Sequence, residues 1–171
     1  MTVTNTFSAN TKIKSASVNT NFSDIDTQIN GSAVNAYRTA TQSMINATYT
    51  TIIFTSESYD TLGEYNNATG IFTAGVTGKY HIESSVHTAN VAWVAGEYNL
   101  LRIWHNNTTA IAQERHQHEA SSTQIAHNFV STETILTAGD NIRIQLLQNS
   151  GVNIGLTTGL FYTRLCIHRI R

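Results

Sequence analysis

Polar and apolar residues alternate along residues 79–88, which predicts a β-strand with one buried face and one solvated face. The apolar side chains of this strand are Tyr80, Ile82 and Val86, and between them lie Lys79, His81, Glu83, Ser85 and His87. Gly75 and Gly78 bound a turn before the strand, because glycine supplies the backbone freedom that tight turns need. A turn at 66–70 and a short strand at 71–73 are expected just upstream.

Two other stretches are apolar on both faces. In residues 98–105, Leu101 and Ile103 occupy one face, whereas Leu100 and Trp104 occupy the other. In residues 160–170 the two sets are Leu160, Tyr162, Cys166 and Ile170 against Phe161, Leu165 and Ile167. Such a strand in a small domain lies either at the centre of a sandwich or at a subunit interface, and both interpretations stay open.

Further strands are expected at 34–42, 50–55, 111–118, 123–137 and 141–148. The first of them is expected at a sheet edge, and the long one carries Ile125, His127, Phe129 and Ile135 on one face. Roughly eight to ten strands with Gly and Asn turns and little helix predict an all-β sandwich or barrel.

The first 34 residues form a different kind of segment. Ser15 or Ser17 is the expected cap of a short helix, and Gly31 is its expected C-terminal stop. The apolar positions of this helix, Val18, Phe22, Ile25 and Ile29, make a narrow stripe that needs a partner, because so short a helix is marginal alone in water. The partner is either another surface, other copies of the helix, or the chain's own domain. We divide the chain into an arm, residues 1–34, and a β-domain, residues 35–171.

Composition narrows the function classes. Charged residues make up 12% of the 171 positions, about half of the ~25% typical of soluble domains, and the net charge is −1. That balance argues against electrostatic binding to nucleic acid or to an anionic membrane. We see no signal peptide in residues 1–10 and no apolar run of the ~20 residues that span a bilayer. Cys166 is the only cysteine, and we interpret it as a small buried hydrophobe.

A family resemblance rests on four motifs that occur in order. The run Tyr65…Gly70-x-Phe72…Gly78-x-Tyr80 resembles the opening of the globular head of complement subcomponent q, the trimeric jelly roll shared with tumour necrosis factor. The other motifs are Ile52-Ile53-Phe54 followed by Asp60, Leu136-x-x-Gly139-Asp140 followed by Ile142, Ile144 and Leu146, and Thr158-Gly159-Leu160-Phe161. Leu160 replaces the usual aromatic residue, Thr77 stands where the family usually has proline, and no collagen stalk is present.

The resemblance implies a homotrimer in which one sheet face of each jelly roll packs around a threefold axis. We expect the strands that hold Trp104 and Phe161 near that axis, and the expected trimer-interface residues are Leu100, Trp104, Phe161 and Leu165. The animal complement setting does not follow from the resemblance.

A second, shorter resemblance covers residues 11–25, which are similar to an element near the N-termini of bacteriophage virion proteins, often fibres and tail proteins. In those proteins the element tends to lie close to the point of attachment. The expected virion-attachment residues are Ile13, Val18, Phe22, Ile25 and Ile29.

Catalytic motifs are absent from the sequence: there is no nucleotide-binding loop, no Cys-x-x-Cys and no Gly-x-Ser-x-Gly. The 11 carboxylates form no obvious pair for glycoside hydrolysis, although such pairing is spatial. His116 and His118 share a strand face with Glu114 and can seed a zinc site, but a third ligand is not evident. We expect a solvated strand or a subunit contact there, with no metal, no cofactor and no enzymatic activity.

These observations favour a phage virion protein, either a capsid decoration (cement) protein or a short head fibre, mounted through its arm on a capsid or tail protein. The alternative is the receptor-binding tip of a tail fibre or spike that recognises a host surface glycan or protein, with Trp93 and the Asn- and His-rich loops as its site. A secreted bacterial binding module is a third hypothesis.

Overall fold

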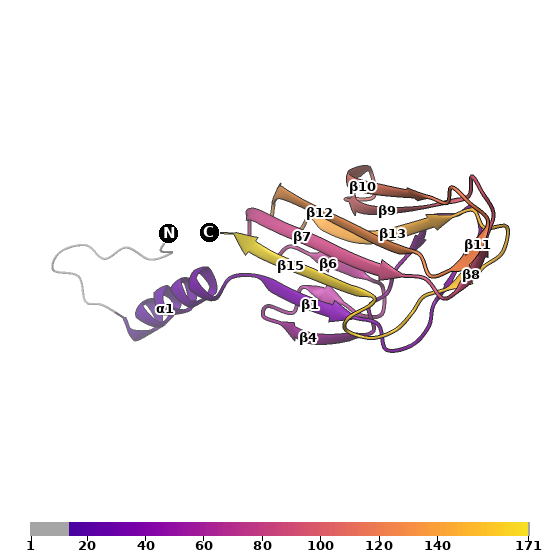
Figure 1. The fold of residues 1–171 in the computed structure, drawn as a ribbon. Coiled ribbons are helices and arrows are strands. Elements are labelled where there is room, and N and C mark those ends of the chain that lie inside the picture. Colours follow the sequence, from indigo (N-terminus) through magenta and orange to yellow (C-terminus); the bar gives the residue numbers. More distant parts are fainter. Residues whose placement is uncertain (1–13, 171) are drawn as a thin grey trace.

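The structure is a computed structural model that describes residues 14–170, with the side chains of residues 24–30 left out (Figure 1). One helix precedes fifteen strands. The elements are α1 (Ser15–Asn30), β1 (Ala33–Tyr37), β2 (Ser43–Met44), β3 (Thr50–Thr51), β4 (Ser56–Asp60), β5 (Tyr65–Asn66), β6 (Ile71–Thr73), β7 (Gly78–His87), β8 (Val91–Trp93), β9 (Tyr98–His105), β10 (Thr109–Gln117), β11 (Ser122–Gln124), β12 (His127–Leu136), β13 (Asn141–Gln148), β14 (Ile154–Gly155) and β15 (Arg164–Ile170).

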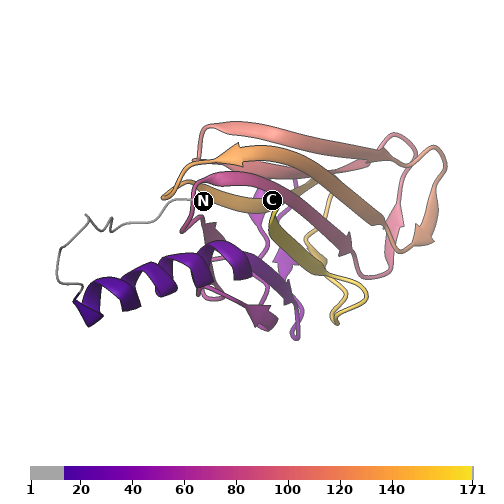
Figure 2. The same cartoon turned by 90° about the vertical axis from the view of Figure 1, so that its left-hand side faces the viewer.

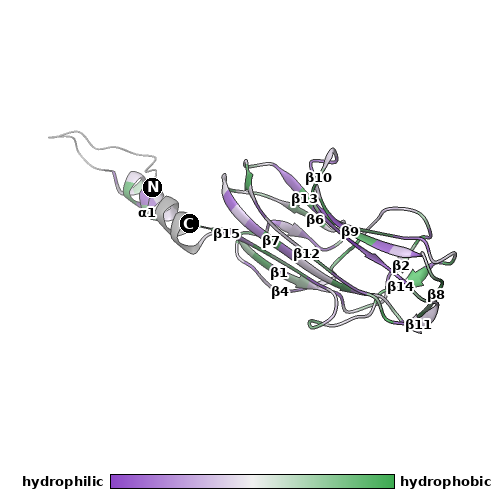
Figure 3. Cartoon of the chain, turned by 45° about the horizontal axis from the view of Figure 1, so that its top comes forward, coloured by the Kyte–Doolittle hydropathy of each residue, from purple (hydrophilic) through white to green (hydrophobic). Residues whose placement is uncertain are grey.

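Two antiparallel sheets face each other across a common core. The five-stranded sheet has the order β12-β7-β15-β1-β4, and the six-stranded sheet has the order β10-β9-β13-β6-β5, with β3 paired to β13. Two small ribbons, β11-β8 and β14-β2, lie at the end of the sandwich opposite the C-terminus (Figures 1 and 3). The predicted all-β jelly roll with an N-terminal helix is confirmed.

Most strands follow the predicted alternation. Strands β6, β9 and β13 have the predicted bounds, and β7 buries Tyr80, Ile82 and Val86 completely. Several expectations were wrong. The strand expected at 123–137 is divided into β11 and β12, which belong to different sheets. Strand β1 is not an edge strand, because β4 pairs with its free side. Strand β15 begins only at Arg164, since residues 160–163 form a turn, and the strand expected at 50–55 shrinks to Thr50–Thr51.

The core is built from the inward side chains of both sheets. Phe72 from the six-stranded sheet meets Tyr80 from the five-stranded sheet edge-to-face, with ring centroids 5.9 Å apart. Tyr65 is buried too, and its hydroxyl accepts a 2.9 Å hydrogen bond from the backbone N–H of Phe54. Three aromatic residues of the opening motif, Tyr65, Phe72 and Tyr80, are therefore core residues. Figure 3 shows that hydrophilic and hydrophobic positions both occur along the strands.

Replacing Gly70 by alanine is expected to destabilise the fold more than replacing Gly63. Both glycines adopt a left-handed φ, +73° and +67°, which costs a side-chain-bearing residue about 1–2 kcal/mol. A Cβ at Gly70 would also lie 2.6 Å from the backbone oxygen of Ile52, whereas a Cβ at Gly63 meets nothing within 4 Å. Urea unfolding of G70A and G63A measures the difference, and equal losses would show that the turn at Gly70 relaxes freely.

Helix α1 projects from the sandwich (Figures 1 and 2). The carbonyl of Lys14 accepts the first helical hydrogen bond, from the N–H of Val18, so Lys14 rather than Ser15 or Ser17 is the N-cap residue. Gly31 follows the last helical residue with φ +66°, the predicted stop. Phe22 is 66% exposed, and the helix extends away from its own domain instead of packing on it. Ile13 lies outside the described residues, as do the side chains of Ile25 and Ile29.

Candidate assembly interface

The outward face of the five-stranded sheet carries large exposed apolar side chains. Among the strands that the structure describes, strongly exposed residues of this kind are Tyr59 in β4 and Phe129 and Ile135 in β12, all of which belong to this one sheet. Phe129 is 45% and Ile135 is 74% exposed. Apolar surface gathered on one sheet face is typical of a site that another protein surface covers.

The strand register shows which side chains share this face. One row runs across all five strands through Tyr59, Asn35, Cys166, Glu83 and Ser131. In the neighbouring rows Phe129 lies opposite Ser85, and Ile135 lies opposite Lys79. We call this set of outward positions the five-stranded face.

Charges on β7, β12 and β15 are paired within the five-stranded face. Lys79 Nζ lies 2.5 Å from Glu133 Oε2, and Arg164 Nη2 lies 3.5 Å from Glu83 Oε1. The Lys79 ammonium lowers the pKa of the Glu133 carboxyl through a hydrogen bond and its charge. Arg169, the remaining charged residue of these strands, is opposite the buried Tyr80 and so lies on the inward side. The two cations and two carboxylates at the outward positions of β7, β12 and β15 thus balance, and covering this face buries no net formal charge from these strands.

Four of the seven histidines also lie on the five-stranded face, in two pairs. His81 and His168 have ring centroids 5.1 Å apart, and His81 Nε2 is 3.6 Å from a Glu83 oxygen. The rings of His87 and His127 are only 4.2 Å apart, and Tyr162 contacts His87 at 5.4 Å. Burial, and secondly the charge of His127, lower the pKa of His87. Both causes favour the neutral form of His87.

The expected interface residues do not share one face. Leu100 and Trp104 lie in β9, on the outward side of the six-stranded sheet. Phe161 is 85% exposed in the turn before β15, which belongs to the other sheet, and Leu165 is 2% exposed within the core. Leu165 therefore has almost no exposed side chain with which to contact a neighbouring subunit. Trp104 belongs to the six-stranded sheet, whereas Phe161 adjoins a strand of the five-stranded sheet. Sequence alternation identifies outward positions but not the sheet to which a strand belongs.

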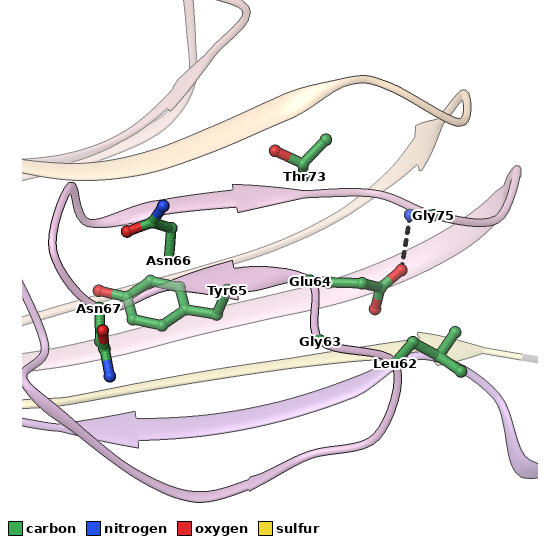
Figure 4. Close-up of a pocket in the computed structure, with 8 residues that line it drawn as sticks. All are labelled: Leu62, Gly63, Glu64, Tyr65, Asn66, Asn67, Thr73 and Gly75. Carbon is green, nitrogen blue, oxygen red and sulfur yellow. Dashed lines mark hydrogen bonds between the residues drawn. The ribbon is translucent and has the colours of Figure 1, made fainter.

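A shallow cavity of about 580 Å³ lies beside the turn before β5 (Figure 4). Glu64 is the only acidic residue that lines it. The Glu64 carboxylate is already occupied, because Oε1 accepts a 2.6 Å bond from the N–H of Gly75 and Oε2 accepts one from the hydroxyl of Ser32. This carboxylate holds the turn against the start of β1, and the cavity lining provides no carboxylate pair for glycoside hydrolysis.

The His116–His118 cluster is a packed structural element. His118 is buried, stacks on Trp93 with ring centroids 4.0 Å apart, and has both ring nitrogens within hydrogen-bond distance of side-chain amides, from Gln124 at 2.7 Å and Asn99 at 3.4 Å. Neither nitrogen is free to bind a metal ion. Trp93 is 1% exposed, which removes it from the glycan site expected in the loops.

Two negative findings apply to the part of the chain that the structure describes. No three side chains of His, Cys, Asp and Glu gather closely enough there to hold a metal ion. The helix described there is too short and too polar to cross a bilayer.

The family model described as the C1q domain matches residues 33–162. Solved structures with the same fold include the globular domain of zebrafish complement 1qA, at 18% identity and a TM-score of 0.57, covering 82% of this chain and 98% of that one. Murine APRIL at pH 5.0 is 13% identical, with a TM-score of 0.61 and coverage of 82% and 99%. Eiger TNF from S. frugiperda is 9% identical, with a TM-score of 0.59 and coverage of 82% and 93%. No curated protein sequence matches the chain.

Proposed function

Because the chain belongs to the C1q domain family, we propose that three copies assemble through the five-stranded face into a structural knob. The resemblance of the opening motif to the C1q and tumour-necrosis-factor jelly roll is confirmed. Domains of this class typically form trimers and are typically binding or structural modules rather than enzymes. The exposure of Phe129 and Ile135 on one sheet is the observation that carries the proposal.

The energetics of the five-stranded face favour association. Fully burying an apolar side chain of the size of Phe or Ile is worth about 1.5–3 kcal/mol, and a trimer buries each one three times. The paired charges Lys79–Glu133 and Arg164–Glu83 enter the interface with their partners in place, which avoids leaving a buried charge uncompensated.

The finer proposal concerns where the knob is mounted. We propose that the arm, residues 1–34, attaches it to a phage virion, as a capsid decoration protein or a short head fibre. Three observations support this proposal. Helix α1 projects away from the sandwich, Phe22 is exposed, and residues 11–25 resemble attachment elements of virion proteins. Three arms joined by one knob would bind together, so that weak single contacts add up to firm attachment.

Removing residues 1–30 is expected to abolish binding to particles and to leave the knob assembled. The truncated and full-length proteins are each mixed with particles that lack the protein, and the bound fraction is measured after sedimentation. A milder variant, Phe22→Ser, should weaken binding without changing the mass of the assembly. Decoration of particles by the truncated knob would contradict the role of the arm.

The second candidate function is a receptor-binding tip, and it also uses a trimeric knob on an arm. Copy number discriminates between the two, because a decoration protein covers the head in high copy and a tail tip is present in low copy. Gel quantification of purified virions gives this number. Absence of the protein from particles would contradict both functions while leaving the trimer untouched.

A further inference from the structure

Three arginines form a diagonal row on the outward side of the six-stranded sheet. Arg115 lies in β10, Arg102 in the adjacent β9 and Arg143 in the next strand, β13. In the register, Arg115 is opposite Leu100 and Arg143 is opposite Trp104, so each step of the row crosses one strand and moves two residues along it. With strands ~4.8 Å apart and a rise of ~3.3 Å per residue, neighbouring arginines have Cα atoms about 8 Å apart.

Aromatic rings hold two of these guanidinium groups in place. The Arg102 guanidinium carbon lies 3.4 Å from the Tyr49 ring centroid and 3.7 Å from that of Trp104, and Nε and Nη2 donate bonds of 2.9 and 2.7 Å to Gln145 Oε1. Arg115 lies 4.1 Å above the Tyr98 ring. Such cation–π contacts fix the guanidinium planes before any ligand arrives.

The third arginine has unused hydrogen-bonding capacity. Arg143 Nε is buried and has no hydrogen-bond partner among the described residues, which is costly for a charged donor group. Arg143 as a whole is half-buried, and a shift of its side chain toward a bound acceptor would let Nε form the missing hydrogen bond.

The three strands that carry the row have no negative charge on their outward side. The other outward positions of β9, β10 and β13 are uncharged, and the one carboxylate within these three strands, Glu114, faces inward opposite Leu101 and accepts a bond from Asn128. Three positive charges thus stand together on a chain whose net charge is −1. We name the face defined by Tyr98, Arg102, Trp104, Arg115 and Arg143 the arginine–aromatic face.

We propose that the arginine–aromatic face binds an acidic glycan through its carboxylate groups. Guanidinium forks match carboxylates in a bidentate geometry, and the exposed Gln113 amide beside the row suits a sugar hydroxyl. A protein partner is less well matched, because protein interfaces centre on apolar anchors, and none of the strongly exposed large apolar residues of the described strands lies on this sheet. The face is outward in a single subunit, so the proposal does not depend on trimer formation.

The test uses oligogalacturonate, a carboxylated glycan, as the probe for the full-length protein in titration calorimetry at low salt. Binding is expected, and neutral dextran of similar length should not bind. Arg115→Gln and Arg143→Gln should each weaken binding about tenfold, the loss typical of one charge-assisted contact. Arg115→Lys should fall between Arg115→Gln and the unchanged protein, since it keeps the charge and loses the planar fork.

The matched control is Lys14→Gln, which removes one positive charge from the arm and should leave the affinity unchanged. Circular dichroism of each variant checks folding, and Arg115 is the safer position because its side chain is exposed. Absence of binding, equal loss in Lys14→Gln, or equal affinity for dextran would overturn the proposal. Equal or tighter binding of poly-glutamate would assign the face to acidic protein instead.

Discussion

Phe129→Glu is expected to convert a trimer of three times 18.8 kDa into monomers of 18.8 kDa, as measured by light scattering. In the isolated subunit Phe129 is 45% exposed, so a glutamate there remains solvated and the fold is kept. In the trimer the same carboxylate would be buried three times, and removing a charge from water costs several kcal/mol per ion when no partner is at hand. Far-ultraviolet circular dichroism should show an unchanged sheet signal.

Leu100→Glu is the matched control, because it places the same charge on the outward side of the six-stranded sheet. The trimer should survive this substitution. If Leu100→Glu produced monomers and Phe129→Glu did not, the subunits would meet through the six-stranded sheet, and our assignment of the interface would be wrong.

Acidification is expected to dissociate the trimer as the pH falls below about 6.5. The pKa of His87 is already lowered by burial and by His127, and subunit contact buries the pair further. If contact lowers the His87 pKa further, the trimer has its full stability above the His87 pKa of the separated subunit, which itself lies below the ordinary ~6.5, and loses stability as the pH falls below it, since the separated subunit then binds more protons. Each unit of pKa depression weakens association about tenfold per subunit, or roughly a thousandfold for three.

The surroundings of the two histidine pairs explain which pair should make the stability of the trimer depend on pH. His87 faces His127 from β12 and Tyr162 from the turn before β15, and the closest charged residue along the register, Arg164, is also positive. Glu83, two rows away on the same strand, is about 13 Å distant along the chain. His81 instead lies beside Glu83, and Glu133 is opposite it on β12, so two carboxylates surround it where none among the described residues surrounds His87.

The variant pair for this test is His87→Gln with His127→Gln, compared with His81→Gln. Sedimentation velocity from pH 8 to pH 5 should show acid dissociation of the unchanged protein and of His81→Gln. The double variant should stay trimeric. Dissociation of the double variant at the same pH would show that other groups govern the transition.

Alternation in the sequence was sufficient to predict an all-β sandwich or barrel and much of the five-stranded face, and the family resemblance narrowed the fold to a jelly roll. The alternation gave β7, β9 and β13 because their inward residues form an unbroken series, and it grouped Phe129 and Ile135 on one side of β12. Local alternation could not predict which strands share a sheet, since this depends on pairing between residues far apart in sequence. Leu100 and Trp104 were therefore placed beside Phe161, although β9 and β15 belong to different sheets.

The burial and stacking of polar side chains could not be predicted from the sequence either. His116 and His118 suggested a metal site because their spacing places two rings on one face. The stacking of His118 on Trp93 depends on β8 and β10 meeting in space, and no local pattern signals it. The same holds for the Tyr49–Arg102–Trp104 stack, whose first member comes from the loop before β3.

Cys166 offers the most direct test of the five-stranded face, because the chain's only cysteine lies at the centre of that face, opposite Asn35 and Glu83. The rate at which a thiol reagent labels Cys166 is measured at neutral pH in the unchanged protein and in Phe129→Glu. Assembly through this face predicts slow labelling of the unchanged protein and fast labelling of the variant. Equal rates in two proteins of different mass would contradict it.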